Sequence, residues 1–409
     1  MAINDSALGQ QDVRLDVLAL RADTPGCDSV IHFNNAGCGL MPKPVLATML
    51  DHLRLEANIG GCEAADTRAA QVDGFYTAIA GLIHALPHQI AFAPSATHAF
   101  LKALSAIAYR AGDVILTTRS DFISNQLAFL ALRKRHGVEI VYAPDRPDGA
   151  GVDLDAMAAL MRSRRPRLVT ATHVSTNSGL VQPIAEIGRY CRDLELLYLL
   201  DACQSVGQYE IDVKAIGCDM LSATCHKWLR GPRGSGFLYV SERALRLGHE
   251  PRFIEMYGLR RPAPDHDASA GTTLRIEDWE FPYATLLGCA EAARYATSLG
   301  VSRISHRAIG LAARLRGRLT GISGVSVHDR GPHPSALVTF DIKGWEPRAL
   351  KQAMDAHGIN SSLTFREYAR YDLANEDMEW CMRLSPHCYN TEDEVDAVAT
   401  VLEAVAASR

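Results

Sequence analysis

The sequence predicts an α/β fold in which a mainly parallel, seven-stranded sheet forms the larger of two domains. The first observation is a series of seven short apolar runs, a pattern typical of strands buried on both faces. These runs cover residues 89–93, 114–118, 139–143, 167–173, 196–201, 220–223 and 236–240. The second observation is that stretches with helical periodicity lie between them, at 97–110, 125–135, 154–163 and 184–194. Strands that alternate with helices form parallel sheets, which bind ligands at the carboxyl ends of their strands.

The pattern changes after Tyr283, and this change predicts a smaller α+β domain at the C-terminal end. Long helices are expected at 286–298 and 302–320, followed by a strand at 335–342 and helices at 347–357 and 391–407. A chain of 409 residues also exceeds one compact core. We therefore expect a large domain of residues 22–295 and a small domain made of residues 1–21 and 296–409. The segment 257–270, rich in Pro, Arg and Asp, is expected to be an irregular loop.

Composition and charge argue against several classes of protein. The chain has 47% hydrophobic and 22% charged residues, as globular proteins do, and its net charge of -5 gives no reason to expect nucleic acid or an anionic membrane as a partner. No apolar run reaches the roughly 18 residues of a membrane helix, and the polar segment 1–11 does not resemble a secretory signal. The ten scattered cysteines lack the density of a disulfide scaffold and the paired spacing of a zinc site. We expect a cytoplasmic protein with reduced thiols and no metal.

A lysine and an acid at the ends of two predicted strands are the most informative residues. Lys227 follows strand 220–223 in the segment Thr224-Cys225-His226-Lys227-Trp228, and Asp201 ends strand 196–201, 26 residues earlier. A lone lysine usually lies on a solvated surface, and an acid after a strand usually caps a helix. Together they match what pyridoxal phosphate requires, which is an amine that forms a Schiff base and an acid that keeps the pyridine nitrogen protonated. Gln204, three residues after Asp201, is a candidate for a hydrogen bond to the 3-hydroxyl of the ring.

The phosphate and the face of the ring have candidate contacts as well. The start of helix 97–110 offers backbone amides and a hydroxyl to a phosphate, although helix capping explains the same pattern. Thr224 and His226, just before Lys227, could reach the same phosphate. The alternative for His226 is a core histidine whose hydrogen bonds are satisfied within the protein. The phosphate candidates are Ala96, Thr97, His98, Thr224 and His226. Phe122, after strand 114–118, is a candidate for stacking on the ring, with core packing as the alternative.

Several motifs give the chain a resemblance to a known family. They include Phe33-Asn34-Asn35-Ala36-Gly37, the segment 172–179, Asp201 with Gln204, His226-Lys227, Gly231-Pro232-Arg233-Gly234-Ser235-Gly236 and the segment 383–395. Through them the chain resembles the class V aminotransferase-fold enzymes nearly from end to end. These fold-type I pyridoxal-phosphate enzymes include cysteine desulfurases, isopenicillin N epimerase and cysteine sulfoxide lyases.

The resemblance implies a role for each candidate residue. Lys227 would carry the Schiff base and act as the catalytic residue, Asp201 would meet the pyridine nitrogen and Gln204 the 3-hydroxyl. Arg383 would hold the substrate carboxylate, with Asn35 as a further candidate for substrate binding. The full set of implied cofactor contacts is Ala96, Thr97, His98, Phe122, Thr176, Asp201, Gln204, Thr224, His226 and Lys227. The resemblance also implies a homodimer with the site between protomers, to which segment 271–279 would contribute.

One departure separates this chain from the desulfurases. Desulfurases carry a catalytic cysteine on a loop upstream of the carboxylate-binding arginine, and the matching segment 359–370 contains none. Cys381 and Cys388 flank Arg383, but we expect them to be packed as small hydrophobes.

The segments 59–66 and 274–283 are more similar to the branch that holds the sulfoxide lyases and the epimerase. We therefore expect β-elimination, through a quinonoid, from an S-substituted cysteine or its sulfoxide. Amino-acid epimerisation and transamination remain alternatives, since the same residues serve all three reactions. A non-catalytic binding protein on this fold would be expected to lose Lys227 or Asp201, and both are present.

Overall fold

The structure is a computed structural model that describes residues 15–256, 259–263, 266–269, 272–280, 282–369, 371–373 and 378–408. The polar segment 1–11, and with it most of the N-terminal part of the expected small domain, lies outside the described residues.

The central element is a seven-stranded sheet with the strand order β2-β8-β7-β6-β5-β3-β4. Its strands are Ile90–Ala93 (β2), Val114–Thr117 (β3), Glu139–Tyr142 (β4), Leu168–Thr172 (β5), Tyr198–Asp201 (β6), Met220–Thr224 (β7) and Gly236–Val240 (β8). Strand β8 runs antiparallel to both of its neighbours, and the other neighbouring pairs are parallel. The predicted mainly parallel sheet of seven strands is therefore confirmed.

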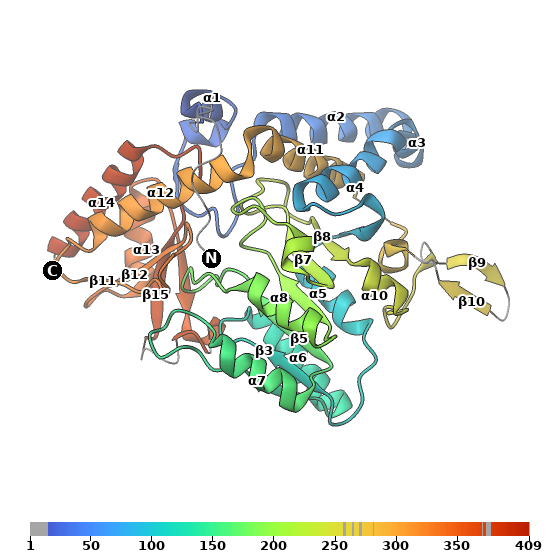
Figure 1. Cartoon of the computed structure of the whole chain (residues 1–409). Coiled ribbons are helices and arrows are strands. Elements are labelled where there is room, and N and C mark those ends of the chain that lie inside the picture. The colour runs from blue at the N-terminus through green and yellow to red at the C-terminus, as the bar shows by residue number, and fades with distance from the viewer. Residues whose placement is uncertain are drawn as a thin grey trace, which may run out of the picture.

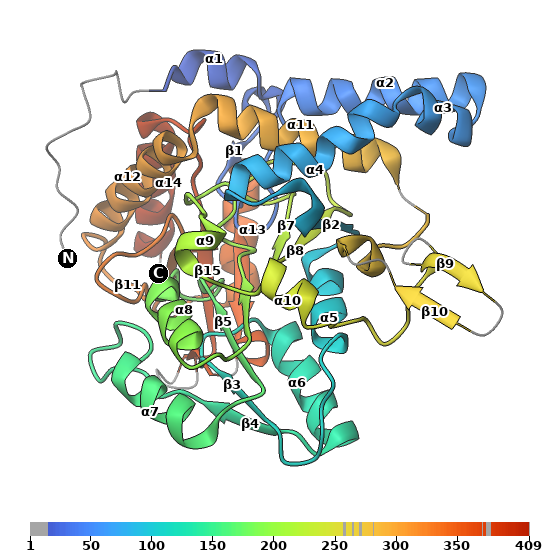
Figure 2. The ribbon, with the colours of Figure 1, turned by 45° about the vertical axis from the view of Figure 1, so that its right-hand side comes forward.

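Apolar side chains cover both faces of this sheet. In β6, Tyr198 and Leu200 belong to one apolar cluster and Leu199 to another, as the alternation of side chains along a strand requires. The first cluster includes residues of Leu154–Arg164 (α7) and Ile184–Asp193 (α8), and the second includes residues of Ala96–Ser105 (α5) and Ile123–His136 (α6). Figure 2 shows the two groups of helices on opposite sides of the strands. The sheet is thus the middle of three layers, and its strand ends remain open for a site.

A group of N-terminal helices packs beyond the edge that β2 and β8 form. It consists of Lys43–Ile59 (α2), Gly61–Thr67 (α3), Ala69–Ile83 (α4) and the later helix Tyr283–Leu299 (α11). Helix α11 packs along α2 and α4 (Figure 1). Across the described ranges, no helix has the length and apolar character that a membrane crossing requires.

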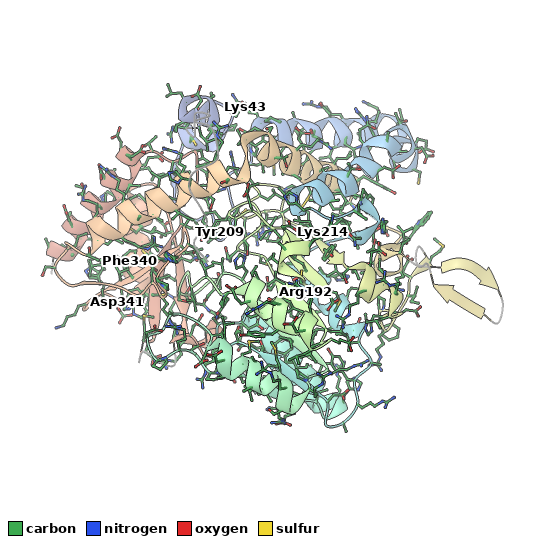
Figure 3. The ribbon with its side chains drawn as sticks, in the orientation of Figure 1. Lys43, Arg192, Tyr209, Lys214, Phe340 and Asp341 are labelled. Carbon is green, nitrogen blue, oxygen red and sulfur yellow. A yellow bond between two sulfur atoms is a disulfide. The ribbon has the colours of Figure 1, made fainter. Side chains whose placement is uncertain are left out.

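The C-terminal part forms a second, antiparallel sheet with the order β11-β12-β15-β14. Its strands are Val325–Val327 (β11), Val338–Ile342 (β12), Ser362–Phe365 (β14) and Trp380–Leu384 (β15), and the helices Val301–Leu319 (α12), Pro347–Ala356 (α13) and Glu392–Ala407 (α14) pack beside it. Phe340 and Asp341 are neighbours in β12 and are labelled in Figure 3. They point to opposite faces of the sheet: Phe340 is fully buried in the core, whereas the Asp341 carboxylate lies 3.0 Å from His328 Nε2. The smaller α+β unit is present, and the exact domain boundaries stay a prediction.

Two expectations about local structure were wrong. Segment 257–270 contains the hairpin Leu259–Ala263 (β9) and His266–Ser269 (β10), which projects from the body of the protein, instead of an irregular loop (Figure 2). Helix α5 ends at Ser105 and not near residue 110, because the chain turns at Ala106 to reach β3.

One pair of cysteines also departs from the expectation of reduced thiols. Cys225, two residues before Lys227, forms a disulfide with Cys289 of α11. Both side chains are fully buried, and they are 64 residues apart in the sequence. The other eight cysteines are free thiols. The disulfide therefore ties the segment that carries Lys227 to the group of N-terminal helices.

The close approach of α8 to Val213–Ile216 (α9) depends on Gly188. A Cβ atom at position 188 would lie 1.8 Å from the carbonyl oxygen of Ile216. We expect Gly188→Ala to lower the midpoint of thermal unfolding by about 5 °C or more, since the backbone must move to relieve the overlap. The measurement is thermal unfolding followed by circular dichroism.

Gly310 of α12 is the matched control, because a Cβ atom there would meet nothing within 4 Å. Gly310→Ala is expected to raise the midpoint slightly, since alanine is favoured over glycine in a helix by up to about 1 kcal/mol. Equal midpoints for the two variants would contradict the packing argument.

Candidate active site

A pocket of about 230 Å³ lies where the carboxyl ends of the large sheet face the four-stranded sheet. Six separate stretches of the chain line it, and the lining residues are Ala36, Gly37, Phe122, Thr176, Asn177, Lys227, Leu363, Thr364, Tyr368 and Arg383. Four residues that the sequence singled out therefore meet in one place. They come from the loops after three strands of the large sheet and from β15 of the small one.

Lys227 follows β7 and borders the pocket with its side chain. The residue is partly exposed to the pocket, yet the surrounding protein removes enough water to lower the pKa of its amine, and Arg383 adds to this effect. Among the described residues, no hydrogen bond or ion pair engages this amine. A Cβ atom at position 39 would lie 2.5 Å from the Lys227 carbonyl oxygen, so Gly39 allows the N-terminal segment to pack directly behind the lysine.

Asp201 ends β6 and is 3% exposed. One carboxylate oxygen accepts the backbone N–H of Cys203 at 2.9 Å, and the other accepts the side-chain amide of Asn125 at 2.8 Å. No lysine or arginine in the described part of the chain forms an ion pair with it. A buried carboxylate without a cation is costly, so this side chain is prepared for a positively charged partner from outside the protein.

Arg383 carries the opposite charge and, among the described residues, likewise lacks an ion-pair partner. Its side chain is 7% exposed, and one guanidinium nitrogen donates to the carbonyl oxygen of Thr176 at 3.0 Å and to the Thr176 hydroxyl at 2.5 Å. Its Nε atom is buried without a hydrogen-bond partner. Burial lowers the pKa of Arg383 to about 10, and no acid among the described residues pairs with it. An anionic ligand is therefore needed to satisfy this group.

The three groups fit pyridoxal phosphate and an amino-acid substrate. Lys227 offers an amine to an aldehyde, and Asp201 offers a carboxylate to a cationic ring nitrogen. Phe122 lines the same pocket, and its stacking on the ring stays a prediction. Arg383 offers a fork of N–H groups to a carboxylate of the substrate. Each of these three charged groups thus matches one functional group of the cofactor or substrate.

The N-terminus of α5 was expected to bind the phosphate, and this stays a prediction. Ala96 and Thr97 lie in the first helical turn, where backbone amides have no acceptor within the helix. A Cβ atom at position 236 would lie 2.9 Å from the Ala96 nitrogen, so Gly236 keeps the space beside these amides open. The amide of His98 is already bonded to the Ser95 side chain at 3.1 Å, so it is not available as the sequence suggested.

Thr224 and His226 lie together before Lys227, with the Thr224 hydroxyl 2.7 Å from His226 Nδ1. Burial and the nearby Lys227 lower the pKa of His226 to about 4. With its proton on Nε2, the neutral imidazole accepts the Thr224 hydroxyl at Nδ1 and can donate to an anion from Nε2; with its proton on Nδ1, it donates to Thr224 instead. Phosphate contacts from this pair stay a prediction.

Two candidate residues are already occupied by protein contacts. The Gln204 amide nitrogen donates to the Ala36 carbonyl oxygen and to the Thr176 hydroxyl, both at 3.0 Å, and its oxygen accepts the indole N–H of Trp228 at 2.8 Å. A hydrogen bond from the Gln204 amide nitrogen to the ring would require this nitrogen to give up its bond to Ala36 or to Thr176. The Asn35 amide donates to Ser385 and accepts from Tyr389, so its side chain has a structural role and substrate contact is no longer expected.

The sequence reasoning missed two polar side chains near the pocket. Asn177 lines it directly, and Asn125 reaches Asp201 from the first turn of α6. Both lie in segments that had been singled out for other residues. A signal was present at Asn125, which lies four residues after Asp121 and so returns to the same face at the start of a helix. Within the described residues, no group of three or more His, Cys, Asp or Glu side chains is arranged to hold a metal ion.

Comparisons with known proteins place this site in a family context. The chain is 27% identical over 402 residues to the probable cysteine desulfurase of Methanothermobacter thermautotrophicus, with 97% of this chain and 98% of that protein covered. It is 28% identical over 380 residues to the probable hercynylcysteine sulfoxide lyase of Mycobacterium tuberculosis, covering 92% and 91% of the two chains. It is 26% identical over 389 residues to isopenicillin N epimerase of Amycolatopsis lactamdurans, covering 92% and 95%.

Solved structures show the same fold. The apo structure of cysteine desulfurase from Thermococcus onnurineus has a TM-score of 0.88 at 24% identity, covering 96% of this chain and 98% of that one. The model of the family described as aminotransferase class-V matches residues 31–398, which span the pocket, Lys227 and Arg383. The chain therefore belongs to the class V aminotransferase family, and its cofactor is pyridoxal 5′-phosphate.

Proposed function

We propose that this protein is a pyridoxal-phosphate-dependent lyase that cleaves the carbon–sulfur bond of an S-substituted cysteine or its sulfoxide. The observation that carries the proposal is that the described lining of the pocket contains Lys227 and Arg383 but no thiol. When bound, the cofactor supplies an electron sink for negative charge at the substrate Cα. The substrate loses its Cα proton and the bond from Cβ to sulfur, the sulfur group leaves with a proton, and water then releases pyruvate and ammonia.

Lys227 is the group that moves the proton. Burial lowers the pKa of its amine, so a larger fraction is neutral and able to accept a proton than for an exposed lysine. Its place at the edge of the pocket lets it reach the Cα hydrogen and later the leaving group. Arg383 fixes the substrate carboxylate, and Thr176 holds the guanidinium in place.

The thiols near the pocket are poor candidates for the nucleophile of a desulfurase. Burial and the adjacent Asp201 raise the pKa of Cys203 well above its ordinary value. Burial raises the pKa of Cys381 to about 12, and its sulfur lies 4.0 Å from the Asn177 carbonyl oxygen beneath Ala369, Leu373 and Met378. A protonated, covered thiol attacks a substrate sulfur slowly. This argues for elimination even though several relatives are named as desulfurases.

The pocket also argues against epimerisation by two bases. Among its described lining residues, only Lys227, Tyr368 and Arg383 are ionisable. Tyr368 is 54% exposed and interacts with Glu367, which raises the pKa of its phenol further. Phe122, where the resemblance places the residue on the ring face, has no proton to exchange. The relative named as a hercynylcysteine sulfoxide lyase supports a sulfoxide as one class of substrate.

The test is product analysis with purified protein and three substrate classes, S-alkyl-L-cysteines, their sulfoxides and L-cysteine. We expect pyruvate and ammonia in equal amounts, detected with lactate dehydrogenase and glutamate dehydrogenase. Lys227→Ala is expected to lower the rate by roughly 10²- to 10⁴-fold or more, because it removes the proton-transfer group.

Three other product patterns would contradict the proposal. Alanine and sulfide from L-cysteine in the presence of a reductant indicate a desulfurase. A keto acid that forms only with an amino acceptor indicates an aminotransferase. A D-amino acid, detected by chiral chromatography, indicates an epimerase.

Thr176 offers a finer test of how the substrate carboxylate is bound. Thr176→Val removes the hydroxyl that accepts from Arg383 and from Gln204 while keeping nearly the same shape. We expect KM to rise about tenfold with a smaller change in kcat, because the loosened guanidinium binds substrate and transition state equally less well.

Thr364→Val is the matched control, since Thr364 lines the same pocket on β14 and contacts Cys381 instead of Arg383. Its KM is expected to stay within about twofold of the wild type. Equal effects of the two changes would show that Thr176 acts only through the shape of the pocket.

The proposed assembly is a homodimer with the site at the interface. Exposed leucines at positions 46, 50 and 53 form a stripe on α2 and support a partner surface, because they recur on one face of the helix. Light scattering would show a mass twice 44.6 kDa if the proposal is right. The cytoplasmic location stays a prediction, and the disulfide between Cys225 and Cys289 does not favour it.

A further inference from the structure

Two acidic side chains and one amide form a closed group beneath the pocket. Asp121, Asn125 and Asp201 are 3%, 2% and 3% exposed. The Asn125 side-chain nitrogen donates to Asp121 Oδ1 at 2.9 Å and to Asp201 Oδ2 at 2.8 Å. An asparagine amide carries two N–H bonds, so the donor capacity of Asn125 is fully used by the two carboxylates.

The two carboxylates cannot both carry a charge at low cost. Neither forms an ion pair with a lysine or arginine in the described ranges, and two buried acids that share a site repel each other when ionised. Burial raises the pKa of Asp121, and the neighbouring Asp201 raises it further. The buried surroundings therefore disfavour the charged form of Asp121.

The arrangement of hydrogen-bond donors differs between the two acids. Asp121 Oδ1 accepts the Asn125 side-chain N–H and the backbone N–H of Phe122, both at 2.9 Å, and lies 2.6 Å from the Thr172 hydroxyl. Among the described residues, Asp121 Oδ2 contacts only the Thr117 hydroxyl, at 2.6 Å, and because a hydroxyl can donate or accept, a proton on this oxygen is tolerated. The two donors at Asp201 are the Cys203 N–H and the Asn125 N–H, which can only donate. Such donors stabilise the ionised form of the acid that accepts from them.

We propose that Asn125 is a positioning residue, which donates one N–H to each acid and thereby holds Asp201 in the orientation and charge state that binds the ring nitrogen of the cofactor. Asn125 itself does not line the pocket, so it acts through Asp201. Its own position is fixed because it lies in the first turn of α6, where its backbone N–H donates to the Phe122 carbonyl oxygen at 3.0 Å. The same turn therefore places the ring-facing Phe122 and the support of Asp201.

The test compares two ligands that differ only at the ring nitrogen. These are pyridoxal 5′-phosphate and its analogue in which carbon replaces that nitrogen. Dissociation constants for the full-length apoprotein are measured by quenching of tryptophan fluorescence, so no turnover is needed. In the wild type the natural cofactor should bind more tightly than the analogue. In Asn125→Leu this ratio of affinities is expected to fall by about tenfold, the usual effect of losing a buried hydrogen bond to a charged group.

Gln126→Leu is the matched control on the next residue of the same helix. Gln126 is also a buried amide, 4% exposed, but it donates to the backbone carbonyl oxygen of Asp121 at 2.9 Å and not to a carboxylate. Its ratio of affinities should equal that of the wild type. Asn125→Ser, which avoids burying a new apolar side chain, should lower the ratio as Asn125→Leu does and serves if the leucine variant fails to fold.

Several outcomes would overturn the inference. Equal loss of both ligands in Asn125→Leu would show a general effect on folding of the site. A drop in the ratio for Gln126→Leu as large as that for Asn125→Leu would remove the link to the carboxylates. A wild-type ratio of one would show that Asp201 does not meet the ring nitrogen. None of these results depends on which substrate the enzyme uses, so failure here is distinguishable from failure of the lyase proposal.

Discussion

The structure depends on three buried or partly buried charged groups that the described protein leaves without a counterion. Lys227, which follows β7, and Arg383 of β15 line one pocket of about 230 Å³, and Asp201 at the end of β6 is close enough to interact electrostatically with Lys227. Removing such groups from water is costly unless something else compensates their charge. The rest of the fold must therefore be rigid enough to hold them in place until the cofactor and substrate arrive. The uncompensated charges therefore lower the stability of the protein until its ligands complete the site.

Rigidity near the lysine comes from close contacts that only glycine permits and from one bridging aromatic residue. A Cβ atom at Gly207 would lie 2.5 Å from the Leu229 nitrogen, so the turn after Gln204 packs directly on the segment after Lys227. Trp228 donates its indole N–H to Gln204, and its carbonyl oxygen contacts His387 at 2.9 Å. The motif after β15 is thereby joined to the lysine segment, which explains why residues so far apart in sequence form one site.

Much of this arrangement could be predicted from the sequence, because buried parallel strands leave a strong apolar signal. The run 167–173 differs from β5 (Leu168–Thr172) by one residue at each end. The hairpin of β9 and β10 left no such signal, since its sequence is polar and contains a proline. Residue types also indicated the site, but they do not reveal which atoms are already bonded. Gln204 and Asn35 are of the right type, and only the coordinates show that their amides are engaged by protein groups.

Residue types alone do not decide between the possible reactions either. The geometry of the pocket narrows the choice of reaction, because the reactions need different numbers of proton-transfer groups. Elimination needs one group that takes the Cα proton and a sulfur that can leave. Two-base epimerisation needs a second acid on the opposite face of the substrate. In the described lining of the pocket, Lys227 is an amine whose pKa is lowered by burial, and the side chain of Phe122 has no proton to exchange. In the proposed reaction a single proton-transfer group acts, so the bond that breaks after proton removal is set by the leaving group on the substrate, and a sulfur substituent at Cβ would direct the site to elimination.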